Sequence, residues 1–222
     1  MLNRPLALGL ALLVAVGTLP ATEPPNLYTL KQQVSGYVAT GEYGKNVAEV
    51  AAQANKYLSA RIPRGIPRSV KRATKLAIVF DIDETTLSNL RHIQSNDYAY
   101  LPKVWNAWVN EGQCTAIFPV QAVYNTAVNG NIDIFFITGR SPDQAAVTER
   151  NLQQVGYEKW TRIFYKPADF AESTKGFKID TRRKLAAEGY LIIANIGDQN
   201  SDLVGGFAEK TFKLPNPFYI VN

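Results

Sequence analysis

The segment from Leu76 to Ser88, LAIVFDIDETTLS, constrains the fold of this chain more than any other. Its apolar residues are followed at once by acidic and hydroxyl residues, which predicts a strand buried on both faces that ends in a polar loop. In an open parallel α/β sheet, ligands bind beyond the carboxyl ends of the strands. We therefore expect Asp81 and Asp83 to project into a ligand crevice.

The spacing of Asp81, Asp83 and Thr85 gives the pattern DxDxT. A carboxylate can attack phosphorus as a covalent nucleophile, and a second carboxylate can protonate the leaving oxygen. The alternative is a solvated turn in which the aspartates cap backbone N–H groups. Because short motifs recur by accident, other parts of the chain must decide between the two interpretations.

The content of histidine and cysteine narrows the chemistry. The chain has 222 residues, 46% of them hydrophobic, which suits one α/β domain with an accessory element. His92 is the only histidine, which argues against zinc hydrolases and histidine-based mechanisms and leaves the chemistry to carboxylates. We expect a surface or hydrogen-bonded structural role for His92. Cys114 is the only cysteine, so no intrachain disulfide can form, and a buried thiol is expected.

Residues 1–22 have the pattern of a secretory signal peptide. Arg4 precedes an apolar run from Leu6 to Leu19, and small residues follow near Ala21. The run is shorter than the roughly 20 residues of a membrane span. The pattern therefore predicts a periplasmic or secreted protein without a stable membrane anchor.

Residues 23–75 are predicted to form N-terminal helices and a basic linker that pack on the core. Apolar residues repeat at helical spacing on both sides of a break near Gly41 and Gly44. The net charge is +5, and residues 61–75 contain basic residues but no acid. Proline and glycine mark this stretch as a linker. It has no aromatic interleaving or binding motif, so we expect no nucleic acid polymer as partner, and its positive field favours anionic substrates.

Strands alternate with helices beyond Leu76, which predicts an α/β fold with a Rossmann-like, doubly wound parallel sheet. Further strands are expected at residues 132–137, 161–165, 191–196 and near 211–214. Helices are expected from Pro119, from Ser141 to Val155, and from about Ile179 to Glu188.

Residues 87–117 lack strand character and are expected to form a small helical cap inserted after the first strand. Four aromatic residues of this cap, Tyr98, Tyr100, Trp105 and Trp108, could stack on the leaving group of a substrate. The alternative is that they only pack the cap against the domain.

A second candidate loop follows the strand at 132–137 and reads Thr138-Gly139-Arg140. A capping pattern then opens a helix at Ser141. The N–H groups at this helix start, with the Thr138 hydroxyl, would suit a phosphate. A plain strand-turn-helix connection is the alternative.

Four motifs in order, FDIDETT at 80–86, ITGR at 137–140, Lys178 and GDQNSD at 197–202, resemble the haloacid dehalogenase superfamily. The resemblance is to its secreted acid phosphatase branch, which contains the bacterial class B and class C acid phosphatases and the plant acid phosphatases related to vegetative storage proteins. It covers most of the chain beyond residue 22. It implies that residues 76–222 form a phosphatase domain of this type.

The resemblance implies a role for each matching residue. Asp81 would be the nucleophile that forms an aspartyl-phosphate, and Asp83 would protonate the leaving alcohol and then deprotonate water. Thr138 would be catalytic and bind the phosphoryl group with Gly139 and Arg140. Lys178 would neutralise charge on the phosphoryl group, although Lys175, three residues earlier, is an alternative. Trp105 and Trp108 are the cap residues expected to bind substrate.

The resemblance also implies a magnesium site. Mg²⁺ would be held by the Asp81 carboxylate, the Asp83 backbone carbonyl and Asp198, with Asp202 acting directly or through water. An all-oxygen site suits this ion, which would offset the repulsion between an anionic nucleophile and an anionic ester.

The sequence thus predicts a secreted, magnesium-dependent acid phosphatase acting on small phosphomonoesters, with nucleoside monophosphates as candidates. A storage or binding protein with little activity is one alternative, although the complete set of motif residues argues against it. A phosphotransferase that uses an alcohol as acceptor is another, because Asp83 could activate either water or an alcohol. The sequence does not fix the oligomeric state.

Overall fold

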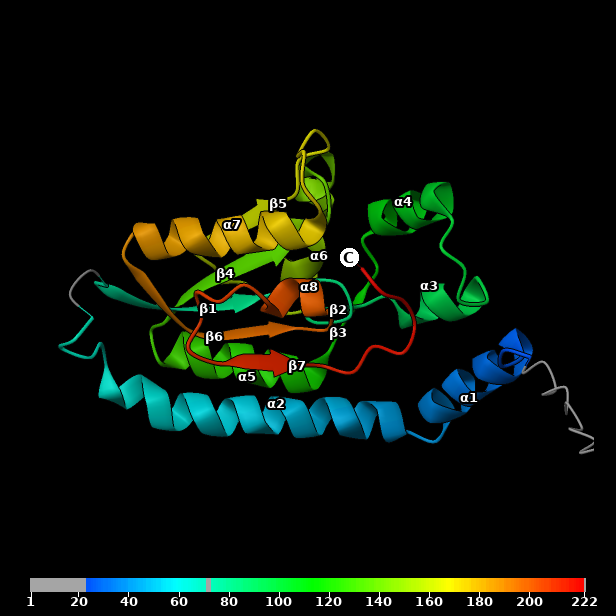
Figure 1. The fold of residues 1–222 in the computed structure, drawn as a ribbon, viewed down its shortest axis with the longest axis horizontal. Coiled ribbons are helices and arrows are strands. Elements are labelled where there is room, and N and C mark those ends of the chain that lie inside the picture. Colours follow the sequence, from blue (N-terminus) through cyan, green and yellow to red (C-terminus); the bar gives the residue numbers. More distant parts are fainter. Residues whose placement is uncertain (1–22, 71–72, 222) are drawn as a thin grey trace, which may run out of the picture.

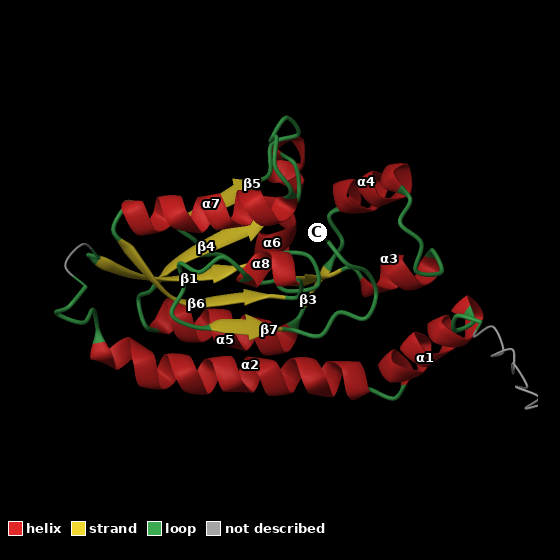
Figure 2. Cartoon of the chain, in the orientation of Figure 1, coloured by secondary structure: helices red, strands yellow, loops and turns green. Residues whose placement is uncertain are grey.

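The computed structural model describes residues 23–70 and 73–221; the expected signal peptide, residues 1–22, lies outside the described residues. A parallel sheet forms the centre of the molecule (Figures 1 and 2). Its strands are β1 (Lys75–Phe80), β4 (Asp133–Thr138), β5 (Arg162–Tyr165), β6 (Tyr190–Gly197) and β7 (Thr211–Lys213). Their spatial order is β5-β4-β1-β6-β7, so the connections run to opposite sides of β1. This is the switch point at which doubly wound sheets bind ligands.

Helices cover both faces of the sheet, as the predicted doubly wound fold requires. They are α1 (Leu27–Ala39), α2 (Glu42–Arg61), α3 (Leu90–Ser95), α4 (Pro102–Glu111), α5 (Phe118–Asn129), α6 (Ala145–Gln154), α7 (Thr174–Ala187) and α8 (Asn200–Leu203), with 3₁₀ turns η1 (Ile62–Arg64) and η2 (Pro142–Gln144). In Figure 1, α2 and α5 lie below the sheet and α7 lies above it. Among the described residues, no helix combines the length and the apolar character that crossing a membrane would need.

Alternation along β1 explains why this strand is apolar from Leu76 to Phe80. Ile78 and Phe80 belong to the core cluster that includes the buried residues of α2 and α5. Ala77 and Val79 belong to the cluster on the other face, which includes Phe177 of α7. Successive side chains of a strand point to opposite faces, so both faces of β1 are buried and its register is fixed by packing.

The N-terminal helices differ in detail from the sequence prediction. The break lies at Gly41, whose φ of +79° is in the left-handed region that glycine adopts without strain. Gly44 lies inside α2 rather than in the break. Arg61 ends α2 and donates through Nε and Nη2 to Glu209, at 2.6 and 2.8 Å. Arg61 is therefore an anchor of α2 and not part of a solvated linker.

The cap contains a small sheet that the sequence did not predict. Strands β2 (Leu87–Ser88) and β3 (Thr115–Ala116) pair antiparallel and close the base of the segment that carries α3 and α4. Two-residue strands are too short to produce a visible alternation of polar and apolar residues. The expectation that residues 87–117 lack strands is therefore corrected.

Helix α7 begins at Thr174, five residues earlier than expected. Ser173 is its N-cap, with the side-chain oxygen accepting from the backbone N–H of Gly176 at 3.3 Å. Gly176 in the first turn has low helix propensity and obscured this start. As a result, Lys178 lies within the helix rather than before it.

Candidate active site

A cavity of about 620 Å³ opens at the carboxyl ends of the central strands. The loops after β1, β4 and β6 contribute Asp81, Asp83, Arg140 and Asp198 to its lining. The cap contributes aromatic side chains, and a segment near the C-terminus contributes residues 218–221. Ligand crevices of open α/β sheets lie at this place.

Asp81 and Lys178 form a buried ion pair at the base of this cavity. The Lys178 Nζ donates to Asp81 Oδ1 at 2.5 Å and to Asp202 Oδ1 at 2.6 Å. Both side chains of the Asp81–Lys178 pair are at least nine-tenths buried. Lys175 is exposed and does not line the cavity, so the geometry selects Lys178 over Lys175.

The buried carboxyl groups around Lys178 outnumber its single positive charge. Burial raises the pKa of Asp81 well above its ordinary value, and the carboxylates of Asp202 and Asp198 raise it further, while Lys178 acts in the opposite direction. Burial acts to lower the pKa of Lys178, but the carboxylates of Asp202 and Asp81 outweigh it and raise that pKa. One ammonium group is thus shared among several buried carboxyl groups.

The same carboxyl groups fit a divalent cation. Ligand oxygens of Asp81, Asp198 and Asp202 all lie within 4.8 Å of one another, and all three residues are buried. Burial also raises the pKa of Asp198, so a cation here would favour the charged forms of these acids. Oxygen donors of this kind suit Mg²⁺ and Ca²⁺.

Asp198 and Asp202 differ in how the protein holds them. Asp198 accepts from the Thr85 hydroxyl at 3.0 Å and from the amides of Gln199 and Asn216 at 2.7 and 2.6 Å. Asp202 accepts from Lys178 through Oδ1 and from the Gln199 backbone N–H through Oδ2 at 2.8 Å, which closes a capping box at the start of α8. Protein donors therefore contact both oxygens of each carboxylate, and the difference is that the Lys178 ammonium contacts Asp202 whereas only neutral donors contact Asp198.

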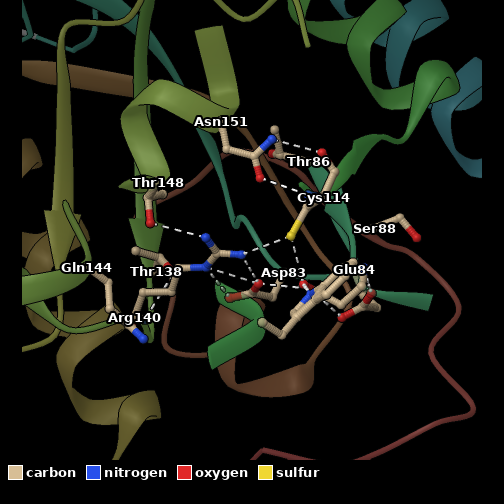
Figure 3. A network of polar contacts seen from close by, with 12 residues as sticks. Asp83, Glu84, Thr86, Ser88, Cys114, Thr138, Arg140, Gln144, Thr148 and Asn151 are labelled. Carbon is tan, nitrogen blue, oxygen red and sulfur yellow. Dashed lines mark hydrogen bonds and ion pairs between the residues drawn. The ribbon is translucent and has the colours of Figure 1, made fainter. Parts of the chain in front are cut away.

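Asp83 is clamped by two side chains. Arg140 donates to Asp83 Oδ1 through Nη2 at 2.7 Å and contacts both carboxylate oxygens through Nε at 3.2 Å. Asn89 donates to the same Oδ1 at 2.9 Å. Figure 3 shows the Arg140 guanidinium between Asp83 and Thr148, whose hydroxyl accepts from Nη1 at 3.1 Å. Arg140 was expected to bind substrate, but its guanidinium is 3% exposed and engaged with Asp83, so we reassign it to positioning that carboxylate.

Thr138 and Gly139 occupy the start of the same loop. Thr138 is fully buried at the end of β4, and its hydroxyl oxygen accepts from the Arg140 backbone N–H at 3.1 Å. Gly139 lines the cavity. Thr138 itself is not among the residues that line the cavity, although its hydroxyl proton is available to donate.

Two polar residues of the first loop were not singled out by the sequence. Glu84 is fully buried at a left-handed φ of +52°, and its carboxyl accepts from the Asn89 backbone N–H at 2.5 Å and from the Tyr219 hydroxyl at 2.8 Å. Burial raises its pKa to about 8, with Asp83 and Asp198 adding to the effect. Asn89 accepts from Trp108 Nε1 at 2.8 Å, so it joins the loop to the cap. The polar run from Asp83 to Thr86 was the available signal for Glu84, whereas Asn89 lies beyond Leu87 and had no such signal.

The cap aromatics divide into two groups. Tyr98, Tyr100 and Trp105 line the cavity. Trp108 does not line it: this side chain is 9% exposed and stacks on His92 with ring centroids 5.4 Å apart. The expectation that Trp108 binds substrate is therefore corrected, because its indole N–H is also held by Asn89.

His92 and Cys114 are both buried, and His92 also lines the cavity. His92 is buried, and its Nδ1 lies 3.3 Å from the amide of Asn96. Cys114 is buried and its thiol donates to Asn89 Oδ1 at 3.1 Å. Burial raises the pKa of this thiol to about 11, which makes it a poor nucleophile. Asn151 of α6 bonds both the N–H and the C=O of Cys114 and ties the cap to the core (Figure 3).

Comparison with known proteins identifies the family of this chain. The family described as HAD (haloacid dehalogenase) superfamily, subfamily IIIB (acid phosphatase), matches residues 21–222. A stem 28 kDa glycoprotein of Glycine max is 37% identical over 69% of this chain and 63% of its own length. Acid phosphatase 1 of Solanum lycopersicum is 32% identical over 64% of this chain and 58% of its own length. The chain thus matches somewhat less than two thirds of each curated relative.

A solved structure supports the fold. The class C acid phosphatase from Bacillus anthracis superposes with a TM-score of 0.70 over 86% of each chain, at 24% sequence identity. The family match extends over nearly the whole sequence and includes every motif residue placed around the cavity. On this evidence the chain belongs to the acid phosphatase family of the HAD superfamily, subfamily IIIB.

Proposed function

We propose that this protein is a secreted, Mg²⁺-dependent acid phosphatase that hydrolyses small phosphomonoesters through an aspartyl-phosphate on Asp81. The observation that carries the proposal is the buried Asp81–Lys178 pair, with Asp83 clamped beside it at the same cavity. The signal-like pattern of residues 1–22 supports secretion, and the aromatic lining of the cap supports aryl or nucleoside leaving groups.

The first step transfers the phosphoryl group to the protein. Lys178 bonds one oxygen of Asp81 and so orients the carboxylate for attack on phosphorus. A bond forms between the Asp81 carboxylate and phosphorus while the ester P–O bond breaks, and the carboxylic acid of Asp83 gives its proton to the leaving alcohol. The Thr138 hydroxyl and the amides after it would bind the phosphoryl oxygens.

The second step regenerates the protein. Asp83, now a carboxylate, takes a proton from water as the water oxygen bonds to phosphorus. The acyl phosphate bond to Asp81 breaks, and inorganic phosphate leaves. A divalent cation held by Asp81, Asp198 and the Asp83 backbone carbonyl would supply the positive charge that offsets repulsion between carboxylate and phosphate.

A panel of phosphomonoesters, assayed with Mg²⁺ and with EDTA, tests this proposal. We expect hydrolysis that requires Mg²⁺ in the wild type and a loss of roughly 10⁴-fold or more in kcat for Asp81→Asn, because the nucleophile loses its charge with little change in volume. Mass spectrometry of acid-quenched wild type should detect a phosphorylated Asp81 peptide.

Three results would change the proposal. Full activity in a folded Asp81→Asn protein would exclude the covalent mechanism. Activity that persists without divalent metal would exclude the metal requirement. Transfer of phosphate mainly to an added alcohol, measured by product analysis, would identify a phosphotransferase rather than a hydrolase.

A further inference from the structure

The segment at residues 216–221, called here the C-terminal segment, lies across the edge of the sheet where the catalytic loops meet. Asn216 donates through its side-chain amide to Asp198 Oδ2 at 2.6 Å. Its side-chain oxygen accepts from the backbone N–H groups of Phe218 and Tyr219, at 2.8 and 3.4 Å. One short side chain therefore makes a turn in its own backbone and holds a buried carboxylate.

These contacts fix the orientation of the Asn216 amide. An asparagine has a donor end and an acceptor end, and here a carboxylate faces one end while backbone N–H groups face the other. The reversed orientation would set oxygen against carboxylate and NH₂ against N–H, which is unfavourable at both ends. Because the turn holds the side-chain oxygen of Asn216 toward the backbone N–H groups, its NH₂ group faces Asp198.

The C-terminal segment is anchored independently of this contact. Gln199 donates to the Tyr219 carbonyl at 3.3 Å and accepts from the Val221 N–H at 3.1 Å. The buried Phe218 ring contacts Tyr43 of α2, with centroids 5.2 Å apart, and stacks on Tyr98 of the cap at 6.3 Å. Asn216 is therefore supported by the core, the cap and an N-terminal helix.

We propose that Asn216 is a positioning residue for the metal site, holding the Asp198 carboxylate where it can bind a divalent cation together with Asp81. The role rests on the proposed function, because it presumes that these acids bind a metal. Side chains that orient metal ligands in this way change metal affinity when they are replaced, typically by about 10–100-fold.

Two substitutions distinguish the contact of Asn216 with Asp198 from its contribution to the turn. Asn216→Ser keeps a hydroxyl that can accept the Phe218 N–H and preserve the turn, but it is too short to reach Asp198. Asn216→Ala removes both contacts. Asn125→Ser, at an exposed position of α5, is the matched control for the chemical change.

Isothermal titration of Mg²⁺ into EDTA-treated protein measures the effect without reference to turnover. We expect Kd to rise about 10–100-fold in both Asn216 variants and to stay at the wild-type value in Asn125→Ser. Unfolding temperatures of the metal-free proteins should show Asn216→Ser close to wild type. A folded Asn216→Ser protein with wild-type Mg²⁺ affinity would reduce Asn216 to a turn residue and overturn the proposal.

Hydrogen exchange of the wild type provides a test that depends on no substitution. If metal binding fixes Asp198, Mg²⁺ should slow exchange of the Phe218 and Tyr219 amides, which donate to Asn216. Unchanged exchange at saturating Mg²⁺ would contradict the coupling. Absence of Mg²⁺ binding by the wild type is a different result, which would refute the metal requirement of the proposed function and this role with it.

Discussion

Asp83 receives donors from two parts of the chain, Arg140 after β4 and Asn89 before α3. In the proposed mechanism, this clamp would set the direction in which the Asp83 carboxyl group delivers a proton. Arginine forms two parallel bonds to a carboxylate, whereas lysine offers a single point of charge. The identity of residue 140 should therefore affect proton transfer more than phosphate binding.

The substitution Arg140→Lys tests whether residue 140 affects proton transfer more than phosphate binding. We expect kcat/KM for an alkyl phosphate to fall about 10–100-fold, which is less than or equal to the roughly 10²–10⁴-fold that general acid catalysis contributes, because Asp83 itself is retained. The value for 4-nitrophenyl phosphate should fall much less, because its leaving group departs without a proton. Equal losses for both esters would mean that Arg140 binds phosphate or supports the fold instead. Thermal unfolding of the variant checks that it is folded.

The sequence predicted the residues whose roles follow from a motif, but not those that hold them. Asp81 and Asp83 could be named because they follow the end of an apolar strand, and Lys178 and Asp198 because the order of the motifs resembles that of a known family. Asn216 could not, because its partner depends on where a loop folds back. Arg140 was placed correctly beside the site, yet its charge is satisfied by Asp83, a pairing that no linear spacing specifies.

Within the cap, Trp105 and Trp108 lie three residues apart on α4 but face different surroundings. Trp105 lines the cavity and lies edge-on to His92, with centroids 5.6 Å apart. Trp108 is buried against His92 and bonded to Asn89. Helical spacing placed the two indoles on similar faces, and only the fold of the cap distinguishes them.

Alanine substitutions at the two tryptophans should therefore have different effects. Trp105→Ala should lower kcat/KM for aryl and nucleoside esters, by an amount equal to a loss of roughly 1–3 kcal/mol of transition-state stabilisation. The values for small alkyl phosphates should not change. Trp108→Ala should lower the free energy of unfolding by about 3–5 kcal/mol without changing the ratio between aryl and alkyl esters. A panel of esters and urea unfolding of both variants measure this. An unchanged ester preference in Trp105→Ala would remove the stacking role.

The later strands of the central sheet were predicted most closely. Strands β4, β5, β6 and β7 begin and end within one or two residues of the expected positions. The β2–β3 pair was missed because each strand has two residues. The start of α7 was missed because a glycine lies in its first turn. Pairing across the base of the cap decides the first case, and the Ser173 N-cap decides the second.

The protein as a whole buries more carboxyl groups than cationic ones around the cavity. Burial raises the pKa values of Glu84, Asp81 and Asp198, that of Glu84 to about 8. Each of these acids holds its proton more tightly in the folded protein than in the unfolded chain, where such groups titrate near pH 4. The stability that they contribute is thus complete below about pH 4 and is lost as pH rises through the folded pKa values.

Metal-free protein should accordingly become less stable between pH 5 and pH 8. Glu84→Gln removes one titrating group, so its free energy of unfolding should fall less over this range than that of the wild type. Urea unfolding in EDTA at several pH values measures how steeply the free energy of unfolding falls with pH. Glu172→Gln, at an exposed position, is the control. Parallel slopes for wild type and Glu84→Gln would contradict the assignment. Mg²⁺ should stabilise the wild type more at pH 8 than at pH 5, because protons compete with the metal.

The anchoring of the C-terminal segment also bears on biosynthesis. Tyr219 contacts Glu84 across 135 positions of sequence, and contacts of such long range form late in folding. A ribosome makes the loop that carries Asp81 before it makes this segment. The cavity can therefore gain its lining residues 218–221 only after synthesis has passed Val221. A growing chain thus contains Asp81 before the cavity around it is complete.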